Sequence, residues 1–93
     1  MILGCAHAGI INTLHHITAQ TRRPVHAVIG GTHLLQASKE RLENTLTELR
    51  RINPEILAPS HCTGPKATAM LWTMFPQSIV QAHVGQTWTF AAA

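Results

Sequence analysis

The residues of this chain that could carry chemistry are mostly histidines and cysteines. The 93-residue sequence contains seven histidines and two cysteines, whereas its only acidic residues are four glutamates. These glutamates lie within or directly after one predicted helix. Because there is no aspartate, a Ser-His-Asp triad or a pair of catalytic carboxylates cannot be assembled in the usual way. Any reaction would depend on imidazole, thiol, hydroxyl or backbone groups.

Three histidines are placed so that each follows a short apolar segment and lies beside glycine or proline: His7, His33 and His61. Neutral imidazole is the commonest side-chain ligand for zinc and for several other transition metals. Cys5 and Cys62 lie next to this set and are expected to bind the metal or to support its ligands. The spacing therefore predicts a divalent metal site, with zinc as the first choice and iron, manganese or nickel as alternatives.

A second candidate feature is the dipeptide Thr63-Gly64, which precedes Pro65. Proline is common at the first position of a helix, and the free N–H groups of a helix start attract anions. Thr63 and Gly64 are therefore expected to bind a ligand or to support the metal site. The other histidines carry a weaker signal. His15 and His16 are helix neighbours expected to face solvent, and His26 and His83 are expected in strands, so none of the four is an expected ligand.

The elements that must position these residues alternate between strands and helices. The predicted order, by residue number, is strand 1–5, helix 9–20, strand 25–29, helix 39–52, strand 56–58, helix 65–75 and two closing strands at 78–84 and 86–90. Ser38 is the predicted N-cap of the second helix. Such alternation favours an α/β fold with parallel strands. Because ligands of such sheets bind beyond the carboxyl ends of the strands, His7, His33 and His61 should converge at one edge.

The composition excludes several classes of protein. A hydrophobic fraction of 45% with 12% charged residues is not that of a disordered chain. No apolar run approaches the roughly 20 residues of a membrane span, and the first residues lack the basic start of a signal peptide. A net charge of +3 does not by itself indicate nucleic-acid binding. We therefore predict a cytoplasmic protein, in which two cysteines would remain thiols.

Three short blocks, taken together, resemble the metallo-β-lactamase superfamily. They are Gly4-Cys5-Ala6-His7-Ala8-Gly9-Ile10, Ile29-Gly30-Gly31-Thr32-His33-Leu34 and Pro59-Ser60-His61-Cys62-Thr63-Gly64. The resemblance is greatest to a branch of metal-dependent hydrolases related to a dihydropterin phosphate synthase of methanopterin biosynthesis. It implies an αβ/βα sandwich with one or two metal ions, for which His7 and His61 would be ligands. His33 would lie at or beside the position of a bridging acidic residue.

The sequence departs from that superfamily in one respect. The main metal-binding signature, His-x-His-x-Asp-His, is absent. The resemblance therefore implies that residues 1–90 form the C-terminal part of a metallo-β-lactamase-like domain, followed by a tail at 91–93. The expected function is that of a metal-dependent hydrolase present as a fragment, and full activity of this chain alone is not expected. The expected partners are further copies of the chain or a missing N-terminal half, together with a small-molecule substrate.

Two alternatives remain open at this point. The chain could be a non-enzymatic domain that binds a metal or associates with itself, using the same histidines. It could also bind a phosphate ester or a pterin-like ligand through Thr63, Gly64 and the helix start. Neither nucleic acid nor a membrane is an expected partner.

Overall fold

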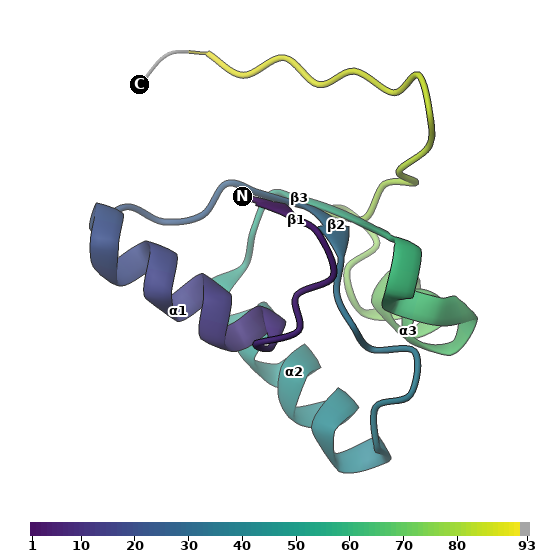
Figure 1. Cartoon of the computed structure of the whole chain (residues 1–93). Coiled ribbons are helices and arrows are strands. Elements are labelled where there is room, and N and C mark those ends of the chain that lie inside the picture. Colours follow the sequence, from purple (N-terminus) through teal and green to yellow (C-terminus); the bar gives the residue numbers. More distant parts are fainter. Residues whose placement is uncertain (92–93) are drawn as a thin grey trace.

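Three parallel strands and three α-helices alternate along the described part of the chain, whose course Figure 1 shows. The structure is a computed structural model that describes residues 1–91, so residues 92–93 of the predicted tail lie outside the described part. In chain order the elements are β1 (Ile2–Leu3), α1 (Ile10–Thr21), β2 (Ala27–Gly31), α2 (Lys39–Ile52), β3 (Ile56–Ser60), the 3-10 turn η1 (His61–Thr63) and α3 (Gly64–Met74). The predicted α/β class and parallel order are confirmed.

The sheet has the order β1-β2-β3, and both neighbouring pairs are parallel. In this register Ile2 lies opposite Ile29, and Gly31 lies opposite Ser60. The carboxyl ends of the three strands therefore meet along one side of the sheet, which we call the carboxyl edge. The three loops that follow the strands all start there.

Strand β3 continues through Pro59 to Ser60, although the sequence analysis ended it before the proline. The reason lies in the direction of the backbone groups. The N–H of Leu57 donates to the carbonyl of Ser78 over 2.9 Å, on the side away from β2. The nitrogen of Pro59, two residues further on, lies on that same side. Its missing N–H therefore removes no hydrogen bond to β2.

The two predicted closing strands, 78–84 and 86–90, are not formed in the described part of the chain. Only Ile79 makes a bridge, to Leu57 of β3, and the N–H of Val80 donates to the carbonyl of Leu57 over 2.8 Å. Beyond Val80 the segment leaves β3 and runs along the side of the sheet opposite α1 and α2 (Figure 1). The prediction was wrong because a strand forms only where its backbone groups pair with a neighbouring strand, and this segment pairs with β3 at Ile79 alone.

Helix α2 has the predicted bounds because strong local signals define both ends. The hydroxyl of Ser38 accepts a hydrogen bond from the N–H of Arg41 over 3.1 Å, which caps the start. Asn53 adopts the left-handed conformation at the other end, and its N–H donates to the carbonyl of Leu49. Within residues 1–91, no helix combines the length and the apolar character that crossing a membrane requires. The cytoplasmic location stays a prediction.

The hydrophobic core lies between the helices and one face of the sheet. Leu14, Leu46, Leu49 and Leu71 are its most completely buried leucines, and Val28 and Leu57 come from the sheet. Because successive strand residues point to opposite faces, Ile29 points away from this core, on the same face as Ile2. Ile2 is 84% exposed. One face of the sheet is therefore covered by helices, while the other presents apolar side chains.

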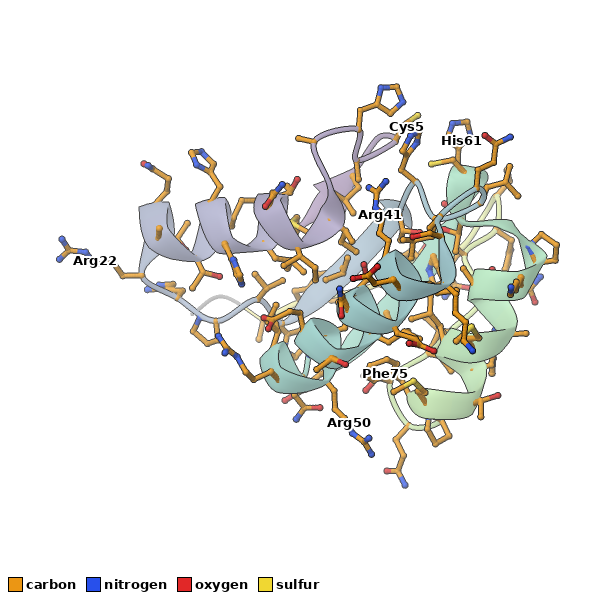
Figure 2. The ribbon with its side chains drawn as sticks, turned by 90° about the horizontal axis from the view of Figure 1, so that it is seen from below. Cys5, Arg22, Arg41, Arg50, His61 and Phe75 are labelled. Atoms are coloured by element: carbon orange, nitrogen blue, oxygen red, sulfur yellow. The ribbon has the colours of Figure 1, made fainter. Side chains whose placement is uncertain are left out.

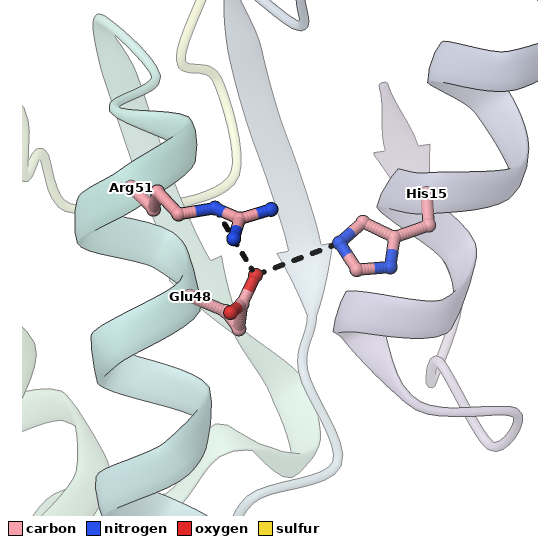
Figure 3. Close-up of polar contacts among 3 residues, drawn as sticks. All are labelled: His15, Glu48 and Arg51. Atoms are coloured by element: carbon pink, nitrogen blue, oxygen red, sulfur yellow. Dashed lines mark ion pairs between the residues drawn. The ribbon is translucent and has the colours of Figure 1, made fainter.

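Helices α1 and α2 are also linked by a polar contact, shown in Figure 3. The Oε2 atom of Glu48 lies 3.6 Å from Nε2 of His15 and 3.8 Å from Nε of Arg51. This oxygen is buried and accepts no hydrogen bond from the described residues. Glu48 is therefore half-buried between the two helices. Ion pairs of this length contribute little to stability.

Candidate metal centre

The backbone is strained at the carboxyl edge. Among the described residues 1–91, five non-glycine residues have a positive φ: Ala6, Arg22, His33, Asn53 and His61. Arg22 and Asn53 are helix C-caps, where this conformation is common. The other three lie one in each loop that follows a strand. A left-handed residue with a Cβ costs about 1–2 kcal/mol, and such residues cluster at functional sites. The carboxyl edge is therefore the candidate site.

Three side chains that can bind a metal meet at this edge: Cys5, His61 and Cys62. Nε2 of His61 and Sγ of Cys5 lie 3.0 Å apart, although 56 residues separate them in the sequence. The thiol of Cys62 donates to the carbonyl of Cys5 over 3.3 Å. One ligand atom from each of the three lies within 4.8 Å of the others. Figure 2 shows Cys5 and His61 side by side at one end of the molecule.

This donor set suits a metal that prefers sulfur. Two thiolates and one imidazole are typical ligands of zinc, and a three-ligand site leaves a fourth position for water or substrate. Partial burial raises the pKa of the Cys5 thiol, and the neighbouring Cys62 raises it further through its charge and through a hydrogen bond. The metal-free site therefore holds Cys5 as a thiol, and a binding metal would displace its proton.

His7 and His33 lie at the same edge but outside this group of three. Their ring centroids are 4.6 Å apart, with the rings tilted by 55°, and both residues are exposed. The backbone N–H of His33 donates to Sγ of Cys62 over 3.1 Å, so His33 also touches the thiol group through its main chain. All three predicted histidines thus follow their strands at the carboxyl edge. The ligand roles given to His7, His33 and His61 stay predictions.

Two buried hydroxyl groups, those of Thr32 and Thr63, anchor the loop that carries His61 and Cys62. Thr32 donates to the hydroxyl of Thr63 over 2.8 Å, and Thr63 donates to the carbonyl of Ser60 over 2.8 Å. Thr63 is only 1% exposed. Of the two roles considered for Thr63, binding a ligand or supporting the site, this geometry fits the supporting role.

Two glycines allow the loops to approach each other closely. A Cβ on Gly31 would lie 2.3 Å from the carbonyl oxygen of Gly4 and 3.0 Å from Sγ of Cys62. Gly64 has a φ of +79°, and a side chain there would collide with Leu35. Both glycines are therefore required by packing at the site.

Arg41 is a residue of this edge that the sequence analysis missed. It lines a cavity of about 300 Å³ with His7 and Asn12, and a second cavity of about 310 Å³ with His33 and Cys62. Among residues 1–91, no glutamate lines either cavity. Figure 2 shows Arg41 directed from α2 toward the end that carries Cys5 and His61. A sequence signal existed, because a basic residue in the first turn opposes the helix dipole.

A larger cavity, of about 760 Å³, lies at the opposite end of the strands. Its lining is mainly apolar and includes Val25, Phe90 and His26. The ring of His26 makes an edge contact with Phe90 and lies 3.5 Å from Glu55. The group of possible metal ligands found among the described residues lies elsewhere, so size alone does not identify the functional site.

Comparison with known proteins bears on this site. No protein-family model matches the chain. Over 87 residues it is 33% identical to the 7,8-dihydropterin-6-methyl-4-(beta-D-ribofuranosyl)-aminobenzene-5'-phosphate synthase of Methanocaldococcus jannaschii. The aligned region covers 92% of this chain and 30% of that protein. It is also 33% identical over 86 residues to the uncharacterized protein MJ0448 of the same organism, with 92% of this chain and 32% of that protein covered.

Among solved structures, the chain superposes on that of Tm1679, described as a metal-dependent hydrolase of the beta-lactamase superfamily. The TM-score is 0.89 and the sequence identity 30%, over 98% of this chain and 36% of that chain. The resemblance to the metallo-β-lactamase superfamily is confirmed. So is its branch, because the synthase named above is a dihydropterin phosphate synthase. The fold corresponds to part of a metallo-β-lactamase domain, as expected.

The chain spans about a third of the length of these three proteins. Their names also point to different reactions, since one is called a synthase and another a hydrolase. The relationship therefore establishes the superfamily and leaves the reaction of this chain to be proposed from the site.

Proposed function

We propose that residues 1–90 provide the C-terminal part of a metal-dependent hydrolase site of the metallo-β-lactamase type. The observation that carries this proposal is the meeting of His61 with Cys5 and Cys62 at the carboxyl edge. Its support is the superposition on a metal-dependent hydrolase with a TM-score of 0.89. A metal site at the carboxyl ends of parallel strands is also where an α/β sheet binds its ligands.

His61 belongs to both sets of ligands that bear on this site. The resemblance assigns the metal to His7 and His61, whereas the geometry places His61 with two thiols. We propose that the thiols and His61 hold zinc in this chain alone. His7 would take its part when the rest of the domain supplies further ligands. A bound divalent metal lowers the pKa of a coordinated water and so provides a nucleophile near neutral pH.

The residues around these ligands would keep them in place and select the substrate. The N–H of His33 orients the Cys62 thiol, and the hydroxyl of Thr63 anchors the loop. Arg41 offers a guanidinium group to both cavities beside the site. Because guanidinium groups bind phosphate and carboxylate oxygens well, we propose a small substrate with an acidic group, such as a phosphate ester.

The second candidate function is binding without turnover. It is favoured by the composition of the three-residue group, which comes entirely from this chain and contains no carboxylate. A hydrolytic site usually needs a group that orients or deprotonates the attacking water. Without one, the chain would be a metal-binding or self-associating domain, with zinc held by Cys5, His61 and Cys62.

A chimera separates the two candidates. Residues 1–90 of this chain replace the matching segment of the M. jannaschii synthase, and metal content and phosphodiester hydrolysis are measured for the chimera and for the chain alone. The hydrolase proposal expects metal-dependent turnover in the chimera, its loss in His61→Ala and its retention in His15→Ala. A chimera that binds metal through His61 without any turnover would favour the binding function.

A further inference from the structure

The two cysteines of the chain lie close enough to react with each other. Cys5 and Cys62 are both free thiols, and their sulfur atoms lie within 4.8 Å of each other. They belong to loops that follow the two outer strands of the sheet, and β2 lies between those strands. A disulfide between them would therefore have to cross the end of β2.

Gly31 leaves the space for that crossing. A Cβ on Gly31 would lie 3.0 Å from Sγ of Cys62 and 3.2 Å from Cα of Cys5, so the two cysteines flank the position that its side chain would occupy. The N–H of Gly31 donates to the carbonyl of Gly4 over 3.0 Å, which holds the first loop against β2. Sγ of Cys62 already lies 3.3 Å from the carbonyl oxygen of Cys5, so the Cys5 thiol is within reach of an S–S bond of about 2.05 Å.

We propose that Cys5 and Cys62 form a reversible intramolecular disulfide across Gly31, and that this disulfide and metal binding exclude each other. The disulfide itself does not depend on the proposed function, whereas the exclusion rests on Cys5 and Cys62 being metal ligands. A disulfide consumes both thiols and leaves His61 as the only donor of the group. Oxidation would therefore release the metal, and a bound metal would protect the thiols.

Glutathione disulfide is a suitable oxidant. Cys62 lines the 310 Å³ cavity together with Arg41, so an anionic disulfide can reach its sulfur. The Cys62 thiolate attacks one glutathione sulfur, which forms a mixed disulfide and releases one glutathione thiolate. The Cys5 thiolate then attacks the Cys62 sulfur and releases the second glutathione thiolate. Two electrons pass from the protein to glutathione, and the two thiol protons end on the two released glutathione molecules.

The test starts from the reduced, metal-free full chain at low concentration, treated with glutathione disulfide. The expected product is a chain that is not covalently linked to another, has lost two hydrogens, has no free thiol and yields a peptide linking Cys5 to Cys62 in mass spectrometry. Cys5→Ser and Cys62→Ser should each yield only a mixed disulfide with glutathione. Survival of both thiols, stable mixed disulfides in the unaltered chain, or crosslinking only between chains would overturn the disulfide.

A second arm adds zinc to test the exclusion. With free zinc at about 100 times its Kd, the disulfide should form about 100-fold more slowly, because only the metal-free fraction reacts. Chelation of the zinc should restore the original rate. An unchanged rate in zinc-saturated protein would overturn the exclusion. Disulfide formation in a chain that binds no zinc would instead contradict the proposed metal ligands and leave the disulfide supported.

Discussion

The hydroxyl of Thr32 donates a hydrogen bond to the hydroxyl of Thr63, 2.8 Å away, inside the protein. The two residues lie in the loops after β2 and β3, so the bond joins neighbouring loops at the carboxyl edge. The hydroxyl of Thr63 in turn donates a hydrogen bond to the carbonyl of Ser60. His61 and Cys62 lie between Ser60 and Thr63 in the sequence, so the hydrogen bond that joins these two residues fixes the turn that carries both side chains.

Thr63→Val should destabilise the protein because it removes this connection while it keeps the shape of the side chain. The buried Thr32 hydroxyl loses its acceptor, which costs about 1–3 kcal/mol. Urea denaturation measures the change in the free energy of unfolding. Thr73→Val is the matched control, since the exposed Thr73 hydroxyl bonds only to the carbonyl of Ala69, and its effect should stay within about 0.5 kcal/mol. Equal effects of the two substitutions would contradict the structural role of Thr63.

Gly31→Ala should both destabilise the fold and weaken metal binding. The added methyl group would press on the Gly4 carbonyl and on Sγ of Cys62, and such overpacking typically costs about 1–3 kcal/mol. Gly4→Ala is the control, because nothing lies within 4 Å of a Cβ at that position. Thermal denaturation and zinc titration of both variants test the idea. A fully stable Gly31→Ala variant with normal zinc affinity would refute the close approach.

Zinc titration of single variants identifies the ligands used by the chain alone. His61→Ala should weaken zinc binding most clearly, by more than the roughly 10- to 100-fold that follows loss of a group supporting a ligand. Cys5→Ala and Cys62→Ala should have similar effects, while His15→Ala and His83→Ala should have none.

His7→Ala separates the two sets of ligands. The resemblance implies that His7 is a metal ligand, and in that case this change should abolish metal binding, as His61→Ala should. Normal zinc affinity in His7→Ala, combined with loss of affinity in Cys5→Ala, would show that the isolated chain uses its thiols. Unchanged zinc affinity in His61→Ala would reject both sets.

Arg41→Gln should weaken the binding of acidic ligands. The substitution keeps a polar side chain but removes the positive charge beside both cavities. Hydrogen bonds to charged groups contribute about 1.5–3 kcal/mol, so inorganic phosphate should bind roughly 10-fold or more weakly. Arg50→Gln is the control, since Arg50 lies in the last turn of α2, away from Cys5 and His61 (Figure 2). Calorimetric titration with phosphate gives the comparison, and equal loss in the two variants would count against a specific role.

Self-association of the chain is predicted from the apolar side chains that stay exposed on the face of the sheet away from the helices. Ile2 is 84% exposed on this face, and a second copy would remove such apolar side chains from water. Sedimentation velocity should show a dimer or higher oligomer, and Ile2→Asp should shift it toward monomer. Trp72→Asp should leave association unchanged, because the half-exposed Trp72 lies on α3, one of the helices that pack on the opposite face of the sheet. A monomeric wild-type chain at high concentration would reject this prediction.

The sequence was most informative where structure depends on near neighbours. The bounds of α2 follow from Ser38 and from the αL residue Asn53, and the position of α3 follows from Pro65. The alternation of strands and helices likewise gave the parallel order, which places the histidine-bearing loops on one edge. These are local or repeating signals that a single sequence contains.

Features that depend on distant contacts were harder to predict. The proline in β3 is tolerated because its nitrogen faces away from β2. The segment that bridges β3 at Ile79 pairs no further, which depends on contacts distant in the sequence. The pairing of His61 with Cys5 joins residues 56 positions apart. Proximity to the edge could be inferred for both residues, but which donors touch is decided by loop conformation, including the positive φ at His61.

His33 and His61 both have a left-handed backbone. At these two positions the residue type that best stabilises the fold therefore differs from the histidine that metal binding would require. Glycine adopts this conformation without steric cost, and asparagine tolerates it well. Variants selected only for resistance to proteolysis should therefore accumulate glycine or asparagine at these positions. Variants selected for metal retention should keep histidine at position 61. Whether they also keep histidine at position 33 would show whether His33 is needed for metal binding. A mutational scan under both selections would thus separate the residues that the fold prefers from those that the site demands.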